Sequence, residues 1–245
     1  MNASASALVA AAEALLLGLY IDAPGAALRV EDRRKAAEVG ALSARVAARL
    51  RGKRRRTVVD LACGQGYAGI AVAQLLGGRA TLVGVEREPV RVERCRAIAA
   101  RLGLDARFQA GDVGAVALPE RPDVVLALHA CGDATDAAIA RAIGLRATFL
   151  LAVPCCHARR AAPAPAGFPR QGVLRRSWDV LLTDARRVLV LEAAGYEVTV
   201  AELVAPTVSP DNLLFDARWI GPSRRSERAS ADLAALDGSG ARPIP

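Results

Sequence analysis

The sequence is poor in lysine and in aromatic side chains. Lys35 and Lys53 are its only lysines, and aromatic residues make up 4% of the 245 positions. Because both lysines precede residue 57, a catalytic centre that requires a lysine is excluded from the rest of the chain. The scarcity of aromatic rings gives little support to recognition of single-stranded bases by stacking.

Secretory and membrane-spanning signals are also missing. The apolar run from Ala7 to Leu19 has no lysine or arginine before it, is interrupted by Glu13, and is too short to cross a bilayer. The five cysteines are an odd number without the spacing of a disulfide framework, so we expect reduced thiols. These absences predict a cytoplasmic protein with no membrane association and no evident obligate protein partner.

Apolar residues and arginine are abundant instead. Hydrophobic residues make up 53% of the chain, the formal net charge is +8, and the isoelectric point is about 9.9. A positive balance of this size permits a polyanionic partner. The basic run from Arg51 to Arg56 is either the solvated end of a helix, where positive charge complements the helix dipole, or a patch that contacts phosphates.

The hydrophobic pattern predicts an α/β fold. Two amphipathic helices (7–20 and 31–50) precede alternating strands and helices, and the alternation predicts a mostly parallel sheet with its ligand site at the carboxyl ends of the strands. We expect strands near 57–61, 81–85, 106–109, 123–128 and 147–153, with helices near 68–76, 89–102, 134–143 and 177–194. Strands at 197–204 and 212–220 are joined by a short link, which predicts a hairpin at the sheet edge.

Three regions follow from this pattern. Residues 1–54 form a helical extension, residues 55–222 form a Rossmann-like domain with a seven-stranded sheet, and residues 223–245 are polar enough to predict disorder.

The organising motif is TVVDLACGQGYAG, from Thr57 to Gly69. A buried strand, a glycine turn and a helix start form the entrance to a nucleotide-type pocket, where backbone N–H groups face the ligand. Gly64 and Gly66 lack the Cβ atom that would keep a ligand away. The glycine spacing also fits a dinucleotide fingerprint, which is a weak signal by itself.

Acidic residues at three successive strand ends favour S-adenosylmethionine over a dinucleotide. Asp60 precedes the glycines, where a carboxylate would attract an ammonium group and repel a pyrophosphate. Glu86 ends the second strand, at the place of an acid that holds ribose hydroxyls. Asp112 follows the third strand and suits the edge of an adenine. Taken singly, each acid could also be a helix cap.

A second group of reactive residues follows the next two strands. The fourth strand ends in Leu128 and continues His129-Ala-Cys131, and the fifth continues Pro154-Cys155-Cys156-His157. A histidine here could align an acceptor and take its proton. Zinc binding, a cysteine nucleophile that attacks a pyrimidine, and simple packing around the pocket floor are the other interpretations. We assign no metal ligands, because the spacing matches no standard zinc motif.

The combination of DLACGQG, LHACGDATD, PCCH and NLLFDARW, between Lys35 and Ile220, resembles a methyltransferase family with a "HACGxATD…CCH" signature. That family is distantly similar to eukaryotic tRNA 2′-O-ribose methyltransferases. The Asn/Asp-Pro-Pro-Tyr turn of amino-group methylation is absent, as are the extra zinc-binding segments of the eukaryotic relatives.

The resemblance implies a class I methyltransferase fold, S-adenosyl-L-methionine as methyl donor and RNA as a substrate. The cofactor residues that it implies, together with neighbours in the same loops, are Asp60, Cys63, Gly64, Gly66, Glu86, Asp112 and Leu128. The implied catalytic residues are His129, Cys156 and His157.

The arginine-rich segment after the second histidine offers candidate substrate contacts. Arg159, Arg160 and Arg175 could clamp phosphates, although a solvated basic lid explains them equally well. We therefore expect a methyltransferase acting on tRNA or rRNA. A small-molecule O-, N- or S-methyltransferase and an inactive binding module of the same fold are the alternatives.

Overall fold

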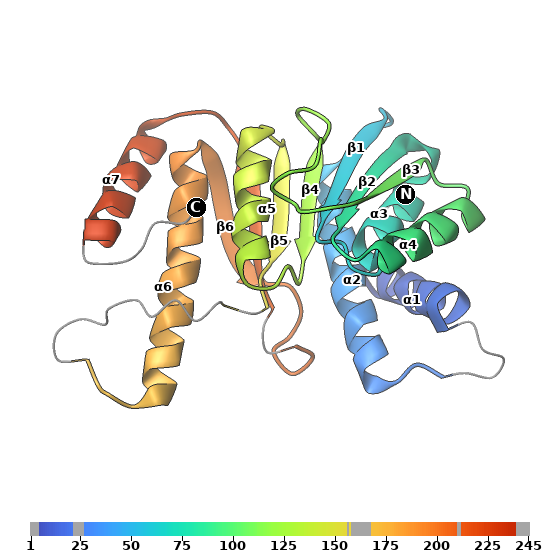
Figure 1. Ribbon diagram of the computed structural model, residues 1–245, viewed down its shortest axis with the longest axis horizontal. Helices are drawn as coiled ribbons and strands as arrows, with labels where there is room; N and C mark the ends of the chain where they lie inside the picture. The colour runs from blue at the N-terminus through green and yellow to red at the C-terminus, as the bar shows by residue number, and fades with distance from the viewer. Residues whose placement is uncertain (1–4, 22–26, 156, 158–167, 210–211, 239–245) are drawn as a thin grey trace.

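A seven-stranded sheet forms the centre of the protein, as the computed structural model shows (Figure 1). The structure describes residues 5–21, 27–155, 157, 168–209 and 212–238. The strands are β1 (Arg56–Leu61), β2 (Ala80–Glu86), β3 (Ala106–Ala110), β4 (Val124–Leu128), β5 (Phe149–Val153), β6 (Tyr196–Glu202) and β7 (Leu213–Trp219).

The strand order is β3-β2-β1-β4-β5-β7-β6. Strands β1 to β5 are parallel, whereas β7 runs antiparallel to both β5 and β6. The predicted mixed sheet and its C-terminal hairpin are therefore confirmed. The sheet order reverses beside β1, which places the carboxyl ends of β1 and β4 at a topological switch point, the usual ligand site of such sheets.

Helices cover both faces of the sheet. Their bounds are α1 (Ala5–Leu15), α2 (Val30–Arg49), α3 (Tyr67–Leu76), α4 (Pro89–Arg101), α5 (Asp133–Gly144), α6 (Gly172–Ala193) and α7 (Arg224–Gly238), with a π-helical turn (Leu16–Ile21) after α1 and a 3₁₀ turn (Gly77–Arg79) after α3. Neighbouring strand residues serve opposite cores: Val58 packs with α2, α3 and α4, while Val59 packs with α5. In the described residues, no helix is both long and apolar enough to cross a membrane.

Two helices reach past the carboxyl ends of the strands. The amino-terminal halves of α2 and α6 extend beyond this edge on its two sides (Figure 1). The helical extension is packed onto the sheet, since Leu42 and Val46 of α2 belong to the same core as Val58 of β1. Both helices can therefore bring side chains to a ligand at this edge.

The prediction of disorder after residue 222 is wrong for most of that segment. Residues Arg224–Gly238 form α7, which packs against α6, and Ala229 is only 2% exposed. The segment contains few apolar residues, but the small side chain of Ala229 allows close approach to α6. Residues 239–245 lie outside the described part of the chain.

The basic run before β1 contacts protein groups at the amino ends of the strands. Arg54 and Arg56 both pair with Asp123, and Arg55 pairs with Asp105. This end of the sheet is opposite to the carboxyl ends, where the ligand is expected. The structure thus favours a helix end with structural ion pairs over a phosphate-contacting patch near the active site.

Candidate active site

The glycine loop after β1 is anchored to β2. The Cys63 N–H donates to the Val85 carbonyl at 2.9 Å, and the Gly64 N–H donates to Glu86 Oε2 at 2.9 Å. The second oxygen of Glu86 accepts from the Glu88 N–H at 3.0 Å. Glu86 is 7% exposed, so its carboxylate is fixed by backbone donors at the mouth of the loop.

Both loop glycines adopt left-handed backbone angles, with φ of +56° at Gly64 and +78° at Gly66. A Cβ atom on Gly66 would lie 2.9 Å from the Cys95 sulfur, so this position requires glycine for two reasons. A Cβ on Gly64 would meet no atom within 4 Å. The open space above Gly64 leaves its backbone accessible to a ligand.

Asp60 lies behind the loop and not on its surface. Its side chain is 1% exposed, and its Oδ2 accepts from the Gly69 N–H of α3 at 2.8 Å. Burial is the main factor that raises the pKa of Asp60 to about 7. It outweighs the hydrogen bond from the Gly69 N–H, which lowers the pKa, and the charge of Glu86 adds a smaller upward contribution. Asp60 therefore braces the junction between the loop and α3. Its predicted contact with the ligand ammonium stays a prediction.

The remaining predicted cofactor residues lie on the same edge. Asp112 follows β3, is exposed, and accepts from the Gly114 N–H at 2.8 Å through Oδ1. Leu128 ends β4 and is partly buried. It packs against the core that contains Val58 and against a smaller apolar cluster formed by α1 and α2. Cys63 is partly buried. Its hydrogen bond to Cys95 is the main cause that raises the pKa of its thiol, and burial is the second cause. A thiol in this state is a packing group rather than a nucleophile.

These residues fit an adenosyl cofactor. The space above Gly64 would admit a ligand, and the carboxylates of Glu86 and Asp112 are acceptors suited to ribose hydroxyls and an adenine amino group. The loop contains no lysine that could neutralise a pyrophosphate.

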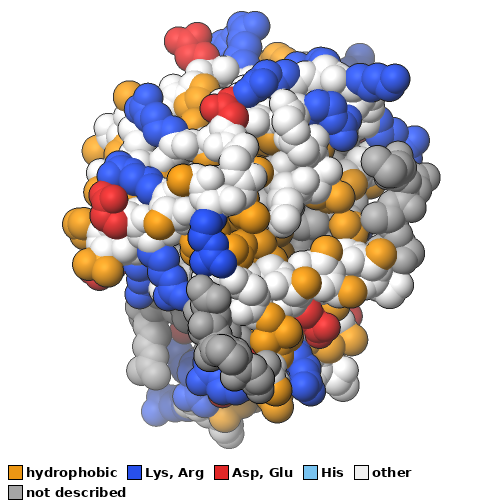
Figure 2. Space-filling model, turned by 90° about the vertical axis from the view of Figure 1, so that its right-hand side faces the viewer, with side chains coloured by type: hydrophobic (Ala, Val, Ile, Leu, Met, Phe, Trp, Pro, Cys, Tyr) orange, Lys and Arg blue, Asp and Glu red, His pale blue; other side chains and the backbone are white. Residues whose placement is uncertain are grey.

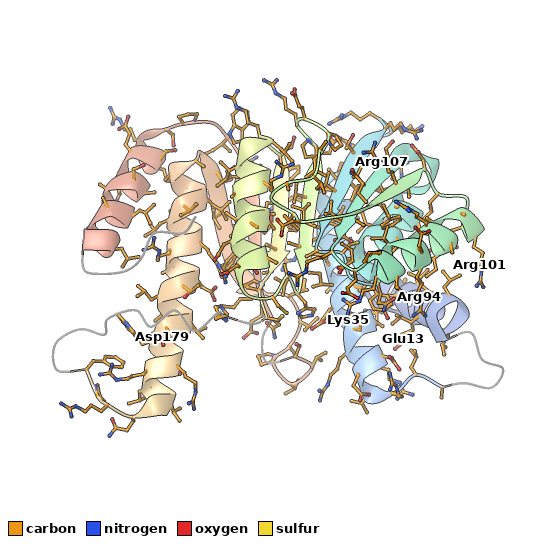
Figure 3. All side chains as sticks on the ribbon, in the orientation of Figure 1. Glu13, Lys35, Arg94, Arg101, Arg107 and Asp179 are labelled. Atoms are coloured by element: carbon orange, nitrogen blue, oxygen red, sulfur yellow. The ribbon has the colours of Figure 1, made fainter. Side chains whose placement is uncertain are left out.

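His129 occupies a strained position directly after β4. Its φ is +59°, an angle that residues other than glycine rarely adopt, and its N–H donates to the Val153 carbonyl at 3.0 Å. Its Nε2 lies 2.7 Å from Oε2 of Glu38 on α2, and Lys35 Nζ lies 3.1 Å from the same oxygen. Figure 3 shows Lys35 projecting from α2 near the carboxyl ends of the strands.

Glu38 is ionised in this arrangement. Burial alone would raise its pKa, but hydrogen bonds and positive charge from His129 and Lys35 outweigh burial and lower the pKa of Glu38 to about 2. The Glu38 residue is only 4% exposed. The other ring nitrogen of His129, Nδ1, is buried and has no hydrogen-bond partner in the part of the chain that the structure describes.

His157 is held by a second carboxylate, from the opposite helical layer. Its Nε2 lies 2.8 Å from Oδ1 of Asp184 on α6, and the same oxygen accepts from Arg187 at 3.1 Å. Arg187 also donates to Asp136 of α5 at 2.7 Å, and its side chain is 1% exposed. A buried chain of charges thus connects the two signature segments, because Asp136 belongs to HACGDATD and His157 to PCCH.

The cysteines of the two segments also meet. Cys131 Sγ and Cys155 Sγ are 3.2 Å apart without a disulfide bond, and no group of three potential metal ligands exists among the described residues. Cys156, a predicted catalytic residue, lies outside the described residues, as do Arg159 and Arg160. Arg175 and Arg176 are exposed near the start of α6, and Arg170, which precedes the helix, is exposed as well.

The structure therefore brings His129, His157, Cys131 and Cys155 to one edge, as the sequence predicts. Glu38 and Asp184 were missed, although each contacts one of the two histidines. Each stands within an amphipathic helix, where an acidic residue normally faces solvent. Only the tertiary packing of α2 and α6 reveals their role, and the sequence carries no local signal for it.

Comparison with known proteins identifies the family. A family model described as a methyltransferase domain matches residues 34–162, which is more than half of the chain. The chain belongs to this family. It is an S-adenosylmethionine-dependent methyltransferase with S-adenosyl-L-methionine as its cofactor. No curated protein matches the sequence.

Solved structures of methyltransferases share the fold at low sequence identity. Magnesium protoporphyrin IX methyltransferase from Synechocystis PCC 6803 with bound S-adenosylhomocysteine has a TM-score of 0.54 and 16% identity, and the match covers 79% of this chain and 89% of that one. A putative rRNA methylase from Clostridium thermocellum has a TM-score of 0.48 and 16% identity, with coverages of 69% and 90%.

The tRNA (uracil-54, C5)-methyltransferase of Pyrococcus abyssi has a TM-score of 0.44 and 15% identity, and the match covers 75% of this chain. It spans only 38% of the archaeal enzyme. The similarity to the magnesium protoporphyrin IX methyltransferase shows the fold and does not distinguish RNA from small-molecule substrates.

Proposed function

We propose that this methyltransferase transfers the methyl group of S-adenosylmethionine to a hydroxyl group of RNA, in a tRNA or an rRNA. The observation that carries this proposal is the pair of histidines, each bonded to a carboxylate, at the carboxyl ends of β4 and β5. A hydroxyl acceptor must lose its proton as the methyl group is transferred, and a carboxylate-bonded imidazole is a suitable acceptor for that proton. Thiolate or amine acceptors depend on such a base less.

The cofactor supplies an electrophilic methyl group, and the chain positions the acceptor beside it. Gly64 and Gly66 would hold the methionine part through the backbone, while Glu86 and Asp112 would hold the ribose and the adenine. Leu128 would contact the ring system beside the histidines. In-line displacement depends on such alignment, which contributes a large part of the rate in reactions of this kind.

Support for RNA comes from the charge on α6. Arg170, Arg175 and Arg176 are exposed at the end of α6 that extends beyond the strands, and arginine forks suit phosphate groups. Basic side chains are also scattered over the face formed by β3, α4 and α1 (Figure 2), so overall charge alone does not mark a binding surface. Arg176 differs from these because it lines the same hollow as Asp184, which bonds to His157.

A small-molecule acceptor is the second candidate, and one observation favours it. A hollow of about 340 Å³ lies between α6 and the start of β7, and Arg176, Val180, Asp184 and Leu213 line part of it. A volume of this size is enough for a compact ligand. Because Asp184 bonds to His157, such a ligand would lie close to the second histidine.

Incubation with S-adenosylmethionine labelled in its methyl group, together with either total RNA or a metabolite extract, tests the proposal. We expect label in RNA, and alkali-resistant labelled dinucleotides after hydrolysis, because 2′-O-methylation blocks cleavage. Label confined to metabolites would overturn the RNA assignment, and labelled bases would overturn the hydroxyl assignment.

Charge reversal on α6 tests the RNA contact, and the same charge reversal on α7 is the matched control. Arg175→Glu with Arg176→Glu should weaken RNA affinity and reduce its dependence on salt, since fewer counterions are released on binding. Arg224→Glu with Arg228→Glu makes the same change in net charge on α7. Equal affinity losses in the two double variants would show that α6 is not the RNA contact.

A further inference from the structure

The helical extension supplies a group to the site of methyl transfer. We propose that Glu38 of α2 is a positioning residue that holds His129 with Nδ1 as the proton acceptor for the methylated hydroxyl. This inference rests on the proposed function, because only a proton-bearing acceptor requires a base.

The first step is the identity of the donor between Glu38 and His129. A carboxylate only accepts hydrogen bonds, and Glu38 is ionised because Lys35 and His129 both stabilise its charge. The 2.7 Å contact therefore requires the proton on Nε2 of His129. In the neutral ring the lone pair must then lie on Nδ1, which becomes the basic nitrogen.

The second step is the state of Nδ1. This atom is buried and has no hydrogen-bond partner in the described part of the chain, an arrangement that is unfavourable for a polar atom. The ring is not wholly enclosed, because 20% of the His129 side chain is exposed. A buried acceptor without a donor is explained if the donor is the substrate hydroxyl.

The third step is the backbone at His129. An angle of +59° is strained for a residue with a Cβ atom, and strain of this kind concentrates at functional sites. Glycine would relieve it without loss of the Val153 hydrogen bond. The histidine side chain therefore stands on a strained backbone, as residues at functional sites often do.

His157 is the competing candidate, and its surroundings differ. Its partner Asp184 is already compensated by Arg187, which also pairs with Asp136. The pair belongs to a buried chain of charges that connects α5, α6 and the segment after β5, as a structural brace does. Among the described residues, the charged groups beside the His129 ring are Glu38 and, bonded to Glu38, Lys35, both on α2. The Cys131 thiol donates to the backbone carbonyl of His129 at 3.5 Å.

An NMR measurement tests the inference without any acceptor. His129 and His157 are the only histidines, so ¹⁵N-histidine labelling gives two rings, assigned with His157→Gln. We expect the neutral ring of His129 to carry its proton on Nε2. A proton on Nδ1 of the neutral ring would overturn the proposal, whatever the substrate proves to be.

Single-turnover methyl transfer together with the NMR readout separates positioning from folding. The amide of Glu38→Gln can donate as well as accept, so it no longer holds the Nε2-protonated tautomer of His129. The rate should fall by about 10²-fold or more, and the neutral His129 ring should carry its proton on Nδ1 in a larger share of molecules. S-adenosylhomocysteine affinity, measured by calorimetry, should stay within about twofold, which shows that the variant is folded.

Asp184→Asn is the matched control, since it neutralises the carboxylate of the other pair. It should lower the melting temperature and leave the tautomer of His129 unchanged, with a smaller loss of rate. A rate that falls in Asp184→Asn and not in Glu38→Gln would transfer the role to His157. If Glu38→Gln fails to fold, His129→Gly with added imidazole replaces it: rescue of the rate supports a base at His129, and no rescue contradicts it.

Discussion

At the scale of single residues, the site depends on carboxylates that are taken out of water. Asp60, Glu86, Glu38 and Asp184 are each less than 10% exposed, and each accepts from a named donor. Buried carboxylates are stable only when they are bonded in this way or protonated. Their differing partners explain why the pKa of Asp60 is raised while that of Glu38 is lowered.

Asp60 makes stability depend on pH in the ligand-free protein. The folded state keeps its proton up to pH about 7, whereas an unfolded aspartate releases it near 3.8. The contribution of Asp60 is fully present below pH 3.8 and is lost as pH rises to about 7, which amounts to about 4 kcal/mol. Urea unfolding should show that the wild type loses more stability than Asp60→Asn between pH 4 and 7. Parallel curves for the two proteins would contradict the raised pKa.

Arg187 compensates the buried charge of Asp184, the carboxylate that bonds to His157. Replacement by leucine leaves Asp136 and Asp184 as buried charges without their shared partner, so we expect a loss of about 3–5 kcal/mol in the free energy of unfolding. Arg218→Leu is the control, because its pair with Glu197 is half exposed and should contribute less than about 1 kcal/mol. Similar losses in both variants, measured by urea unfolding, would show that the buried chain is not formed.

At the scale of elements, the sequence predicts what local patterns determine. The apolar strands, the glycine loop and the final hairpin follow from short-range chemistry, and all are found. The start of α6 at Gly172 and the helix α7 were not predicted, because their residues are mostly polar and exposed. The contacts of Glu38 and Asp184 were not predictable either, since they join residues 91 and 27 positions apart in the chain.

The packing of α7 can be tested with two substitutions in this helix, one at a buried position and one at an exposed position two residues away. Ala229→Asp places an unpaired charge against α6 and should destabilise the protein by about 2 kcal/mol or more. Ala231→Asp, at an exposed position of the same helix, should change the stability by less than about 0.5 kcal/mol. If thermal unfolding shows no difference between the two, the segment does not pack as a helix.

At the scale of the whole molecule, both helical layers converge on one edge of the sheet. The α2 layer holds His129 through Glu38, and the α6 layer holds His157 through Asp184, so the site lies between two arms that extend past the strands. The sheet supplies the third side through the glycine loop, Glu86 and Asp112. An acceptor that reaches the histidines must therefore pass the amino-terminal half of α2 or of α6, and the exposed arginines favour α6 for a phosphate backbone.

The most direct measurement of this account is a crystal structure of the protein with S-adenosylhomocysteine. We predict that the nucleoside lies at the carboxyl ends of β1 to β3, with its ribose within about 2.6–3.2 Å of the Glu86 carboxylate and its amino-acid part over Gly64. A nucleoside bound elsewhere, or one at this edge without a contact to Glu86, would contradict the account.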